Sequence, residues 1–307
     1  MHCPHCRAES RISRKGYFPR KTGPKLRIMR FLCRGCGRHF SEQTHTLSEN
    51  HRRPDLNQFV YLLLNSGVSQ RRTARLLQTT QTTVARKLVR LGCFAEAFEQ
   101  SRRSRRLGPV TTAVFDEMET FEHSKCKPLS IAVAVEEGSR RLIAAKVAQM
   151  PAKGRLAAIS LKKYGYRKDH RRSALAAVLK SVSEISASSL IIKSDQCPRY
   201  PKAVKIYLPS AIHFTFKGRK ACVVGQGELK AGGFDPLFSL NHTCAMFRDN
   251  LKRLARRTWC TTKRPDRLQC LVNIYICAHN AMIDHAEGLA RSGAPTNFLG
   301  LPAGAEV

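Results

Sequence analysis

Apolar residues recur with helical spacing between residues 56 and 92, in the run LNQFVYLLLNSGVSQRRTARLLQTTQTTVARKLVRLG. The pattern predicts a first helix that ends near Leu64 and a second helix with Ser69 as its N-cap. A turn at 79–81 leads into a third helix, whose inner positions are Val84, Leu88 and Leu91. Three short helices in this order indicate a helix-turn-helix. The alternative is a plain three-helix bundle with a solvated basic face.

The pattern changes to strands from Val110 onward. The runs VTTAVFDEMETFE, LSIAVAVEE and RLIAAKVAQM predict three consecutive antiparallel strands, with a Gly138-Ser139 turn before the third. A helical stretch at 171–185 then precedes the short apolar run SLIIKSD, which is typical of a buried strand and ends at Asp195. Three strands, a helix and a fourth strand are the order of a ribonuclease-H-like domain, in which the first and fourth strands are neighbours.

Two CxxC pairs lie near the N-terminus, Cys3/Cys6 and Cys33/Cys36. Two such pairs supply the four thiolates that a structural zinc ion prefers in tetrahedral geometry. The sequence therefore predicts a zinc ribbon. Four unrelated buried cysteines are the alternative, and a catalytic zinc is disfavoured because four thiolates leave no open coordination position.

These patterns predict an α+β chain of several domains: an N-terminal zinc ribbon, a helix-turn-helix bundle and a C-terminal ribonuclease-H-like mixed α/β domain. With 307 residues, of which 42% are hydrophobic, the chain is long enough for such a division. The expected boundaries are 1–48 for the ribbon, 54–100 for the helix-turn-helix, 101–109 for a basic linker, 110–287 for the ribonuclease-H-like domain and 288–307 for a disordered tail rich in Gly, Pro and Ala.

The formal net charge of +32 points to a nucleic acid as the partner, because binding to phosphates releases counterions. Ribosomal and histone-like proteins are equally basic, so charge alone does not identify an enzyme. No apolar run approaches the ~20 residues of a membrane-spanning helix, and the N-terminus lacks the apolar segment of a signal peptide. We therefore expect no membrane association, a cytoplasmic location close to the nucleoid, and double-stranded DNA as the partner.

Candidate DNA contacts lie in two basic segments and one loop. On the third predicted helix, Arg86, Lys87 and Arg90 are expected to face the DNA. A later helix is expected to present Arg248, Lys252, Arg253 and Arg256 as a basic face. The loop at 163–172, with two tyrosines among basic residues, is a weaker candidate. Trp259, which follows the second basic segment, is expected to pack in the core rather than stack on a base.

The acidic run FDEMETFE, residues 115–122, stands out in so basic a chain. In a ribonuclease-H-like fold, Asp116 on the first strand and Asp195 at the end of the fourth would meet, because neighbouring strands lie ~4.8 Å apart. Two such carboxylates can hold magnesium, which supports phosphodiester chemistry by activating the attacking oxygen and stabilising the leaving one. Glu117 is expected to point to the opposite strand face. The alternative to a catalytic role for Asp116 is that it is an ordinary buried acid.

The segment FRDNLKRLARRTWCTTK, residues 247–263, resembles the final helix and following turn of transposases of the insertion sequence one family. The SDQCPRY context around Asp195 adds to the likeness, and the order of parts matches to about residue 280. The resemblance implies a DDE-type transposase with a structural zinc, a catalytic magnesium and an Asp, Asp, Glu triad. It also implies that the chain acts as a homo-oligomer on DNA, because two element ends must be cut and joined together.

The match fails at the third acid. Alignment of KRLARRT without a gap puts Asn241 where the family has a glutamate, and an uncharged amide should hold magnesium more weakly. Glu228 or Asp235 could replace the missing carboxylate, and we favour Glu228, because Asp235 precedes a proline and suits a turn or a helix start. The predicted function is strand cleavage and transfer of an insertion sequence. A decayed transposase acting as a DNA-binding repressor, and a structure-selective nuclease, are the alternatives.

Overall fold

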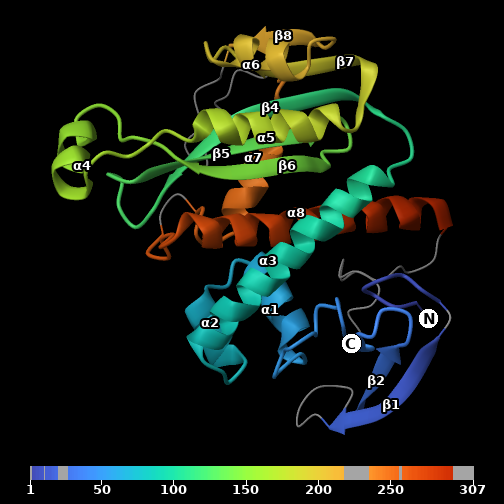
Figure 1. The fold of residues 1–307 in the computed structure, drawn as a ribbon. Coiled ribbons are helices and arrows are strands. Elements are labelled where there is room, and N and C mark those ends of the chain that lie inside the picture. Colours follow the sequence, from blue (N-terminus) through green and yellow to red (C-terminus); the bar gives the residue numbers. More distant parts are fainter. Residues whose placement is uncertain (1, 10, 20–26, 218–234, 256–257, 293–307) are drawn as a thin grey trace.

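The computed structural model describes residues 2–9, 11–19, 27–217, 235–255 and 258–292 (Figure 1). A small N-terminal sheet is followed by a group of helices, which lies beneath a larger mixed sheet with helices on both faces. None of the helices in the described part of the chain is long and apolar enough to cross a membrane.

The N-terminal sheet consists of three antiparallel strands in the order β1-β2-β3. The strands are β1 (Ile12–Pro19), β2 (Arg27–Cys33) and β3 (His39–Ser41). The apolar residues buried in and beside this sheet are Cys3, Ile28, Phe31, Cys33 and Phe40, and the two phenylalanine rings stack at 5.3 Å between centroids. Few apolar side chains are buried here, and a small core of this kind is common in domains that also depend on a metal.

The segment predicted to be a helix-turn-helix has the three helices that the hydrophobic pattern predicts. They are α1 (Leu56–Asn65), α2 (Gln70–Leu76) and α3 (Gln81–Ser104). Ser69 caps α2 by accepting a hydrogen bond from the Arg72 backbone N–H, and Thr80 caps α3 by accepting one from Thr83 at 3.1 Å. Helix α3 continues four residues into the segment predicted to be a linker, so the start of that segment is helical.

The large sheet has five strands in the order β6-β5-β4-β7-β8. They are β4 (Val110–Phe121), β5 (Pro128–Glu136), β6 (Leu142–Gln149), β7 (Ser186–Asp195) and β8 (Ile212–Phe216). The first three pair antiparallel, whereas β4 and β7, and then β7 and β8, pair parallel. The prediction that the first and fourth strands of this region lie side by side is confirmed, and the sheet resembles that of the ribonuclease-H-like fold.

Alternating residues of β4 face two separate apolar layers. Ala113 and Phe115 face the layer with α5 (Arg171–Ser183) and α6 (Tyr200–Tyr207). Val114 and Met118 face the layer with α7 (Phe238–Asn250) and α8 (Pro265–Ser292). A further helix, α4 (Leu156–Tyr164), stands beyond the end of the sheet, at the left of Figure 1. Helix α8 continues through residue 292, and the rest of the predicted tail lies outside the described residues.

One apolar core joins the helix-turn-helix to the large sheet. Leu56 of α1 and Leu88 of α3 belong to the same buried cluster as Val114 and Leu129 of the sheet. Helices α3 and α8 cross at Gly92, where an added Cβ would lie 2.5 Å from the Cβ of Cys270. This close approach requires glycine, because any side chain would overlap α8.

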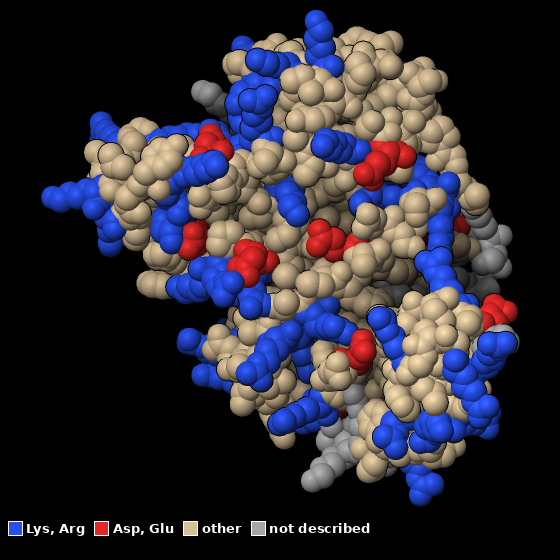
Figure 2. Space-filling view, viewed as in Figure 1, with Lys and Arg blue, Asp and Glu red and all other residues tan. Residues whose placement is uncertain are grey.

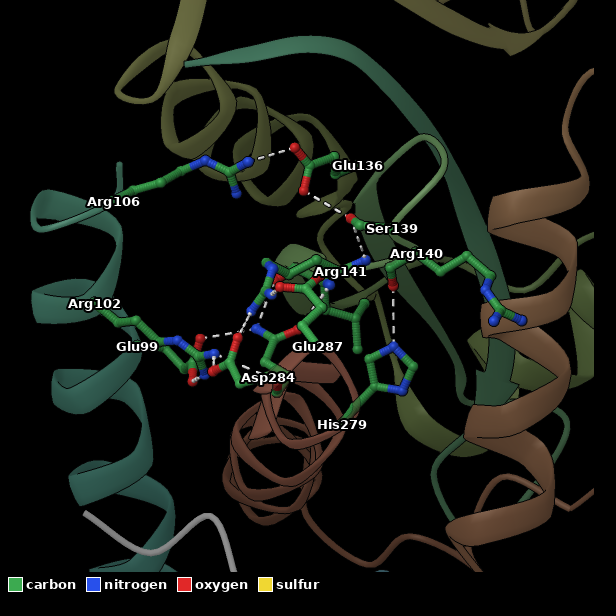
Figure 3. A network of polar contacts seen from close by, with 12 residues as sticks. Glu99, Arg102, Arg106, Glu136, Ser139, Arg140, Arg141, His279, Asp284 and Glu287 are labelled. Atoms are coloured by element: carbon green, nitrogen blue, oxygen red, sulfur yellow. Dashed lines mark hydrogen bonds and ion pairs between the residues drawn. The ribbon is translucent and has the colours of Figure 1, made fainter. Parts of the chain in front are cut away.

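Polar contacts continue the junction between α3 and α8 (Figure 3). The buried Asn280 side chain donates to Glu99 Oε2 at 2.8 Å, and its Oδ1 accepts the Leu142 backbone N–H at 2.9 Å. Arg102 of α3 pairs with Asp284 of α8, which also pairs with Arg141 at 2.5 Å. A buried Glu is tolerated only when hydrogen-bonded or paired, so these contacts fix how the two helices meet.

Candidate functional site

The four N-terminal cysteines converge as their spacing predicts. Cys3 Sγ lies 3.8 Å from Cys36 Sγ, and Cys6 Sγ lies 3.6 Å from Cys33 Sγ. Four sulfurs at ~2.3 Å from a tetrahedral zinc ion would be separated by about 3.8 Å, so the donor set fits that ion. All four sulfurs lie within 4.8 Å of one another, and no other group of three or more candidate ligands among the described residues is this compact.

Asp116 and Asp195 lie on neighbouring strands, close enough for the charge of Asp195 to act on Asp116. The parallel ladder between β4 and β7 pairs Thr112 with Ile191 and Val114 with Lys193. The same register, continued by two residues, would put Asp116 opposite Asp195 on the sheet face that α7 covers. Neighbouring parallel strands lie ~4.8 Å apart, so two carboxylates in this position can share a cation.

Hydrogen bonds hold both carboxylates. Oδ1 of Asp116 accepts the Glu117 backbone N–H at 2.6 Å and the Tyr200 hydroxyl at 2.9 Å. Oδ1 of Asp195 accepts the Cys197 backbone N–H at 2.9 Å. Burial, together with the charge of Asp195, raises the pKa of Asp116 to about 6, against the two hydrogen bonds that lower it. A cation bound between the two carboxylates would relieve this cost.

Glu117 is closer to the site than the sequence indicated. Its side chain is 6% exposed, pairs with Arg199, and accepts a hydrogen bond from Ser130 at 3.2 Å. The Tyr200 hydroxyl, which binds Asp116, also lies 3.5 Å from Glu117 Oε2. Strand alternation predicts the face of Glu117 correctly. It cannot predict that Arg199 and Tyr200, at the start of α6, contact Glu117.

Helix α7 packs over the same sheet face as Asp116. Burial raises the pKa of the Cys244 thiol on this helix to about 12, and the negative charge of Asp116 contributes to the rise. Asn241 lies one helical turn earlier, and its amide donates to Asp235 Oδ2 at 3.0 Å. Asp235 Oδ1 in turn accepts the Leu237 backbone N–H at 3.0 Å, so Asp235 stands at the start of α7. Glu228 lies outside the described residues.

The predicted DNA contacts on α3 divide into two kinds. Arg86 is exposed at the helix surface. Lys87, by contrast, is only 5% exposed, and its ammonium group donates to Asn57 Oδ1 at 2.7 Å, so the prediction that it faces DNA is wrong. Arg90 is partly exposed and donates to the Thr46 backbone oxygen at 3.3 Å, which connects α3 to the segment that follows β3. The helical pattern alone could not distinguish a buried lysine from an exposed one.

The second basic segment is not one helical face. Helix α7 ends at Asn250, so Arg248 lies on it, whereas Lys252 and Arg253 follow its end. Lys252 is exposed, and burial lowers the pKa of Arg253. Arg256 lies outside the described residues. Trp259 is fully exposed, at 103% relative accessibility, so the prediction that it packs in the core is wrong.

Comparison with known proteins gives a distant likeness among solved structures. No protein-family model and no curated protein matches this sequence. Among solved structures, a chain of the crystal structure of the Mos1 strand transfer complex aligns over 78% of this chain and 79% of its own length. The sequence identity is 13% and the TM-score 0.22.

Proposed function

We propose that this chain is a DNA transposase that cleaves and joins DNA strands of an insertion sequence by metal-dependent phosphoryl transfer. The observation that supports the proposal is the parallel pairing of β4 with β7 in a strongly basic chain, because that register, continued by two residues, would bring Asp116 and Asp195 together. The four-cysteine cluster and the helices before the sheet support it, because they occur in the order of the insertion sequence one transposases.

The residues of the site have distinct roles in this proposal. Tyr200 and the Glu117 backbone N–H both bind Oδ1 of Asp116, which leaves Oδ2 for a cation. Asp195 supplies a carboxylate from the adjacent strand, and one or two carboxylates are a usual protein contribution to magnesium. Bound magnesium supplies activation of the attacking oxygen and stabilisation of the leaving oxygen. Because two element ends must be joined, the active species is a homo-oligomer on double-stranded DNA.

The third ligand is proposed to be Glu228, with Asn241 and Asp235 as alternatives. Asp235 already binds the Leu237 backbone N–H and the Asn241 amide, and a carboxylate used in this way is less available to a metal. Glu228→Gln and Asn241→Glu separate the possibilities in a cleavage assay. Loss of activity in the first variant supports Glu228. Activity that rises in the second and stays unchanged in the first supports a decayed site.

The test of the proposed function is removal of each strand carboxylate. With DNA that carries the sequences flanking the gene, Asp116→Asn and Asp195→Asn should abolish magnesium-dependent cleavage and joining while binding of the same DNA persists. Glu119→Gln is the matched control, because Glu119 is exposed on the same strand and pairs with Lys153. Full joining activity in Asp116→Asn would overturn the assignment.

A DNA-binding repressor derived from such an enzyme is the second candidate, and Asn241 in place of a glutamate favours it. It predicts binding to the element ends without cleavage at any magnesium concentration. A structure-selective nuclease of the same fold predicts cleavage without joining. Analysis of both products in the same reaction therefore separates all three functions.

A further inference from the structure

An arm projects from the end of the large sheet. It consists of the β4–β5 turn, residues 122–127, and residues 151–168, which include α4. Figure 2 shows Lys and Arg side chains gathered on this lobe. The segment 258–262, which contains Trp259, is attached to the arm, because Thr262 pairs with Glu122 and its backbone oxygen accepts the His123 N–H at 2.7 Å.

Polar contacts make the arm a defined structure. The buried Ser160 hydroxyl of α4 donates to the Cys126 backbone oxygen in the β4–β5 turn at 2.6 Å. Glu122, at the base of the turn, pairs with Lys127 at 2.6 Å and with Arg167 at 3.6 Å. The arm therefore presents a fixed surface, which lowers the entropy cost of binding a partner.

The outward face of the arm is basic. Arg155, Ile159 and Lys162 occupy helical positions i, i+4 and i+7, on the side of α4 away from Ser160, and all three are exposed. Further exposed cations on the arm are Lys125, Lys163 and Lys168. The carboxylates nearby are already paired, Glu122 as above and Glu119 with Lys153 at 2.5 Å. Positive charge therefore remains in excess on the surface.

Exposed aromatic side chains accompany these cations. Tyr166 is 84% exposed, and Trp259 is fully exposed on the attached segment. Aromatic rings among basic side chains are a common composition of surfaces that contact nucleic acids.

The arm also lies in line with the candidate site. Strand β4 runs from Asp116 to Phe121 at the base of the arm, five residues or about 17 Å further along. Between them, Arg199 pairs with Glu117, and the charge of Glu117 also acts on Arg171 at the start of α5. Arg199 and Arg171 thus add positive charge around Glu117, the residue next to Asp116 on β4.

We propose that the arm, together with the Trp259 segment, is a docking face for the backbone of duplex DNA whose strand lies in the candidate site. A protein partner fits less well: the exposed Ile159 and Leu161 are two positions apart on α4, so they point in different directions and form no apolar stripe. The proposal rests on the proposed function for the origin of the DNA, but DNA binding by the arm can be tested without catalysis.

The first experiment uses Trp259, the sole tryptophan, as a fluorescence reporter. Random-sequence duplex DNA is titrated into the full-length protein with no added magnesium. Binding should quench Trp259 emission, and Arg155→Glu/Lys162→Glu should weaken binding about tenfold and reduce the salt dependence of log K by about 2. Lys180→Glu/Lys205→Glu, which reverses two exposed cations on α5 and α6, is the matched control and should bind normally.

Equal affinity of the arm variant and the wild-type protein, or no change in emission at saturating DNA, would overturn the proposal. A photo-crosslinking amino acid at Ile159 gives a second readout. An adduct with a DNA strand supports the proposal, whereas an adduct with a second copy of the chain, or none at saturating DNA, contradicts it. The Asp116→Asn protein should give the same DNA adduct, because the crosslink does not depend on catalysis. A wrong catalytic assignment would therefore leave the adduct unchanged, whereas a wrong assignment of the arm would abolish it.

Discussion

Among single residues, Asp116 should make the free energy of unfolding depend on pH. Burial raises its pKa from 3.8 to about 6. The native state therefore favours the protonated form, and the resulting stabilisation is complete below pH 4 and lost as the pH rises through 6. Two pKa units correspond to about 3 kcal/mol. With no added magnesium, the unfolding free energy of the wild-type protein should fall by about this amount, relative to Asp116→Asn, between pH 4 and 7.

Urea denaturation of both proteins at a series of pH values measures this difference. The Asp116→Asn variant is the reference, because asparagine does not titrate. A difference that stays constant with pH would mean that Asp116 is not held in a desolvated position. Added magnesium should reduce the pH dependence in the wild-type protein, because a bound cation stabilises the carboxylate.

Residue-level predictions from sequence succeeded where spacing or strand order fixes a position. The four cysteines converge because each CxxC turn aims two thiols at one point, and β4 and β7 are neighbours as the strand order predicts. The roles of Asp116 and Asp195 stay a prediction. Residue-level predictions failed where the burial of one side chain depends on distant contacts. Lys87 is buried, and its ammonium group donates a hydrogen bond to Oδ1 of Asn57 on another helix, which no periodicity within α3 indicates.

At the scale of elements, the ribbon should depend on zinc for its structure. Few residues are buried in and beside its three strands, and two of them, Cys3 and Cys33, are candidate zinc ligands. A Cys6→Ser/Cys33→Ser variant should lose bound zinc, measured by elemental analysis, and become sensitive to limited proteolysis within residues 1–48. Cys93→Ser, an exposed cysteine on α3, is the control and should behave as the wild-type protein. A zinc-free ribbon that resists proteolysis would contradict this role.

Element boundaries were less predictable than element types. The short helices and the strands lie where periodicity indicates. The charge pattern after Arg248 predicts that one helix carries the whole basic segment, but α7 ends at Asn250. The charged run favours a helix by propensity alone, whereas the buried Leu251 and Leu254 draw the chain across the core in a different conformation. Tertiary burial overrides local preference here.

For the whole molecule, the division into domains by sequence suggests more independence than the packing allows. The helix-turn-helix and the large sheet share one apolar cluster through α8. The junction was not predictable, because Gly92 and Asn280 have no local pattern that marks them as contacts, and each acquires its role only from the helix that crosses it.

The shared core predicts that these two parts unfold together. In native-state hydrogen exchange, the slowest amides of α3 and of β5 should report the same free energy of opening, because neither part keeps its core without the other. Gly92→Ala should lower both values equally, by about 1–3 kcal/mol, since the added Cβ would overlap Cys270. Cys93→Ala, at the next and exposed position, should lower neither. If Gly92→Ala lowered protection only in α1–α3, the helices would be an independent unit, and DNA binding there could not be coupled to the sheet through a common core.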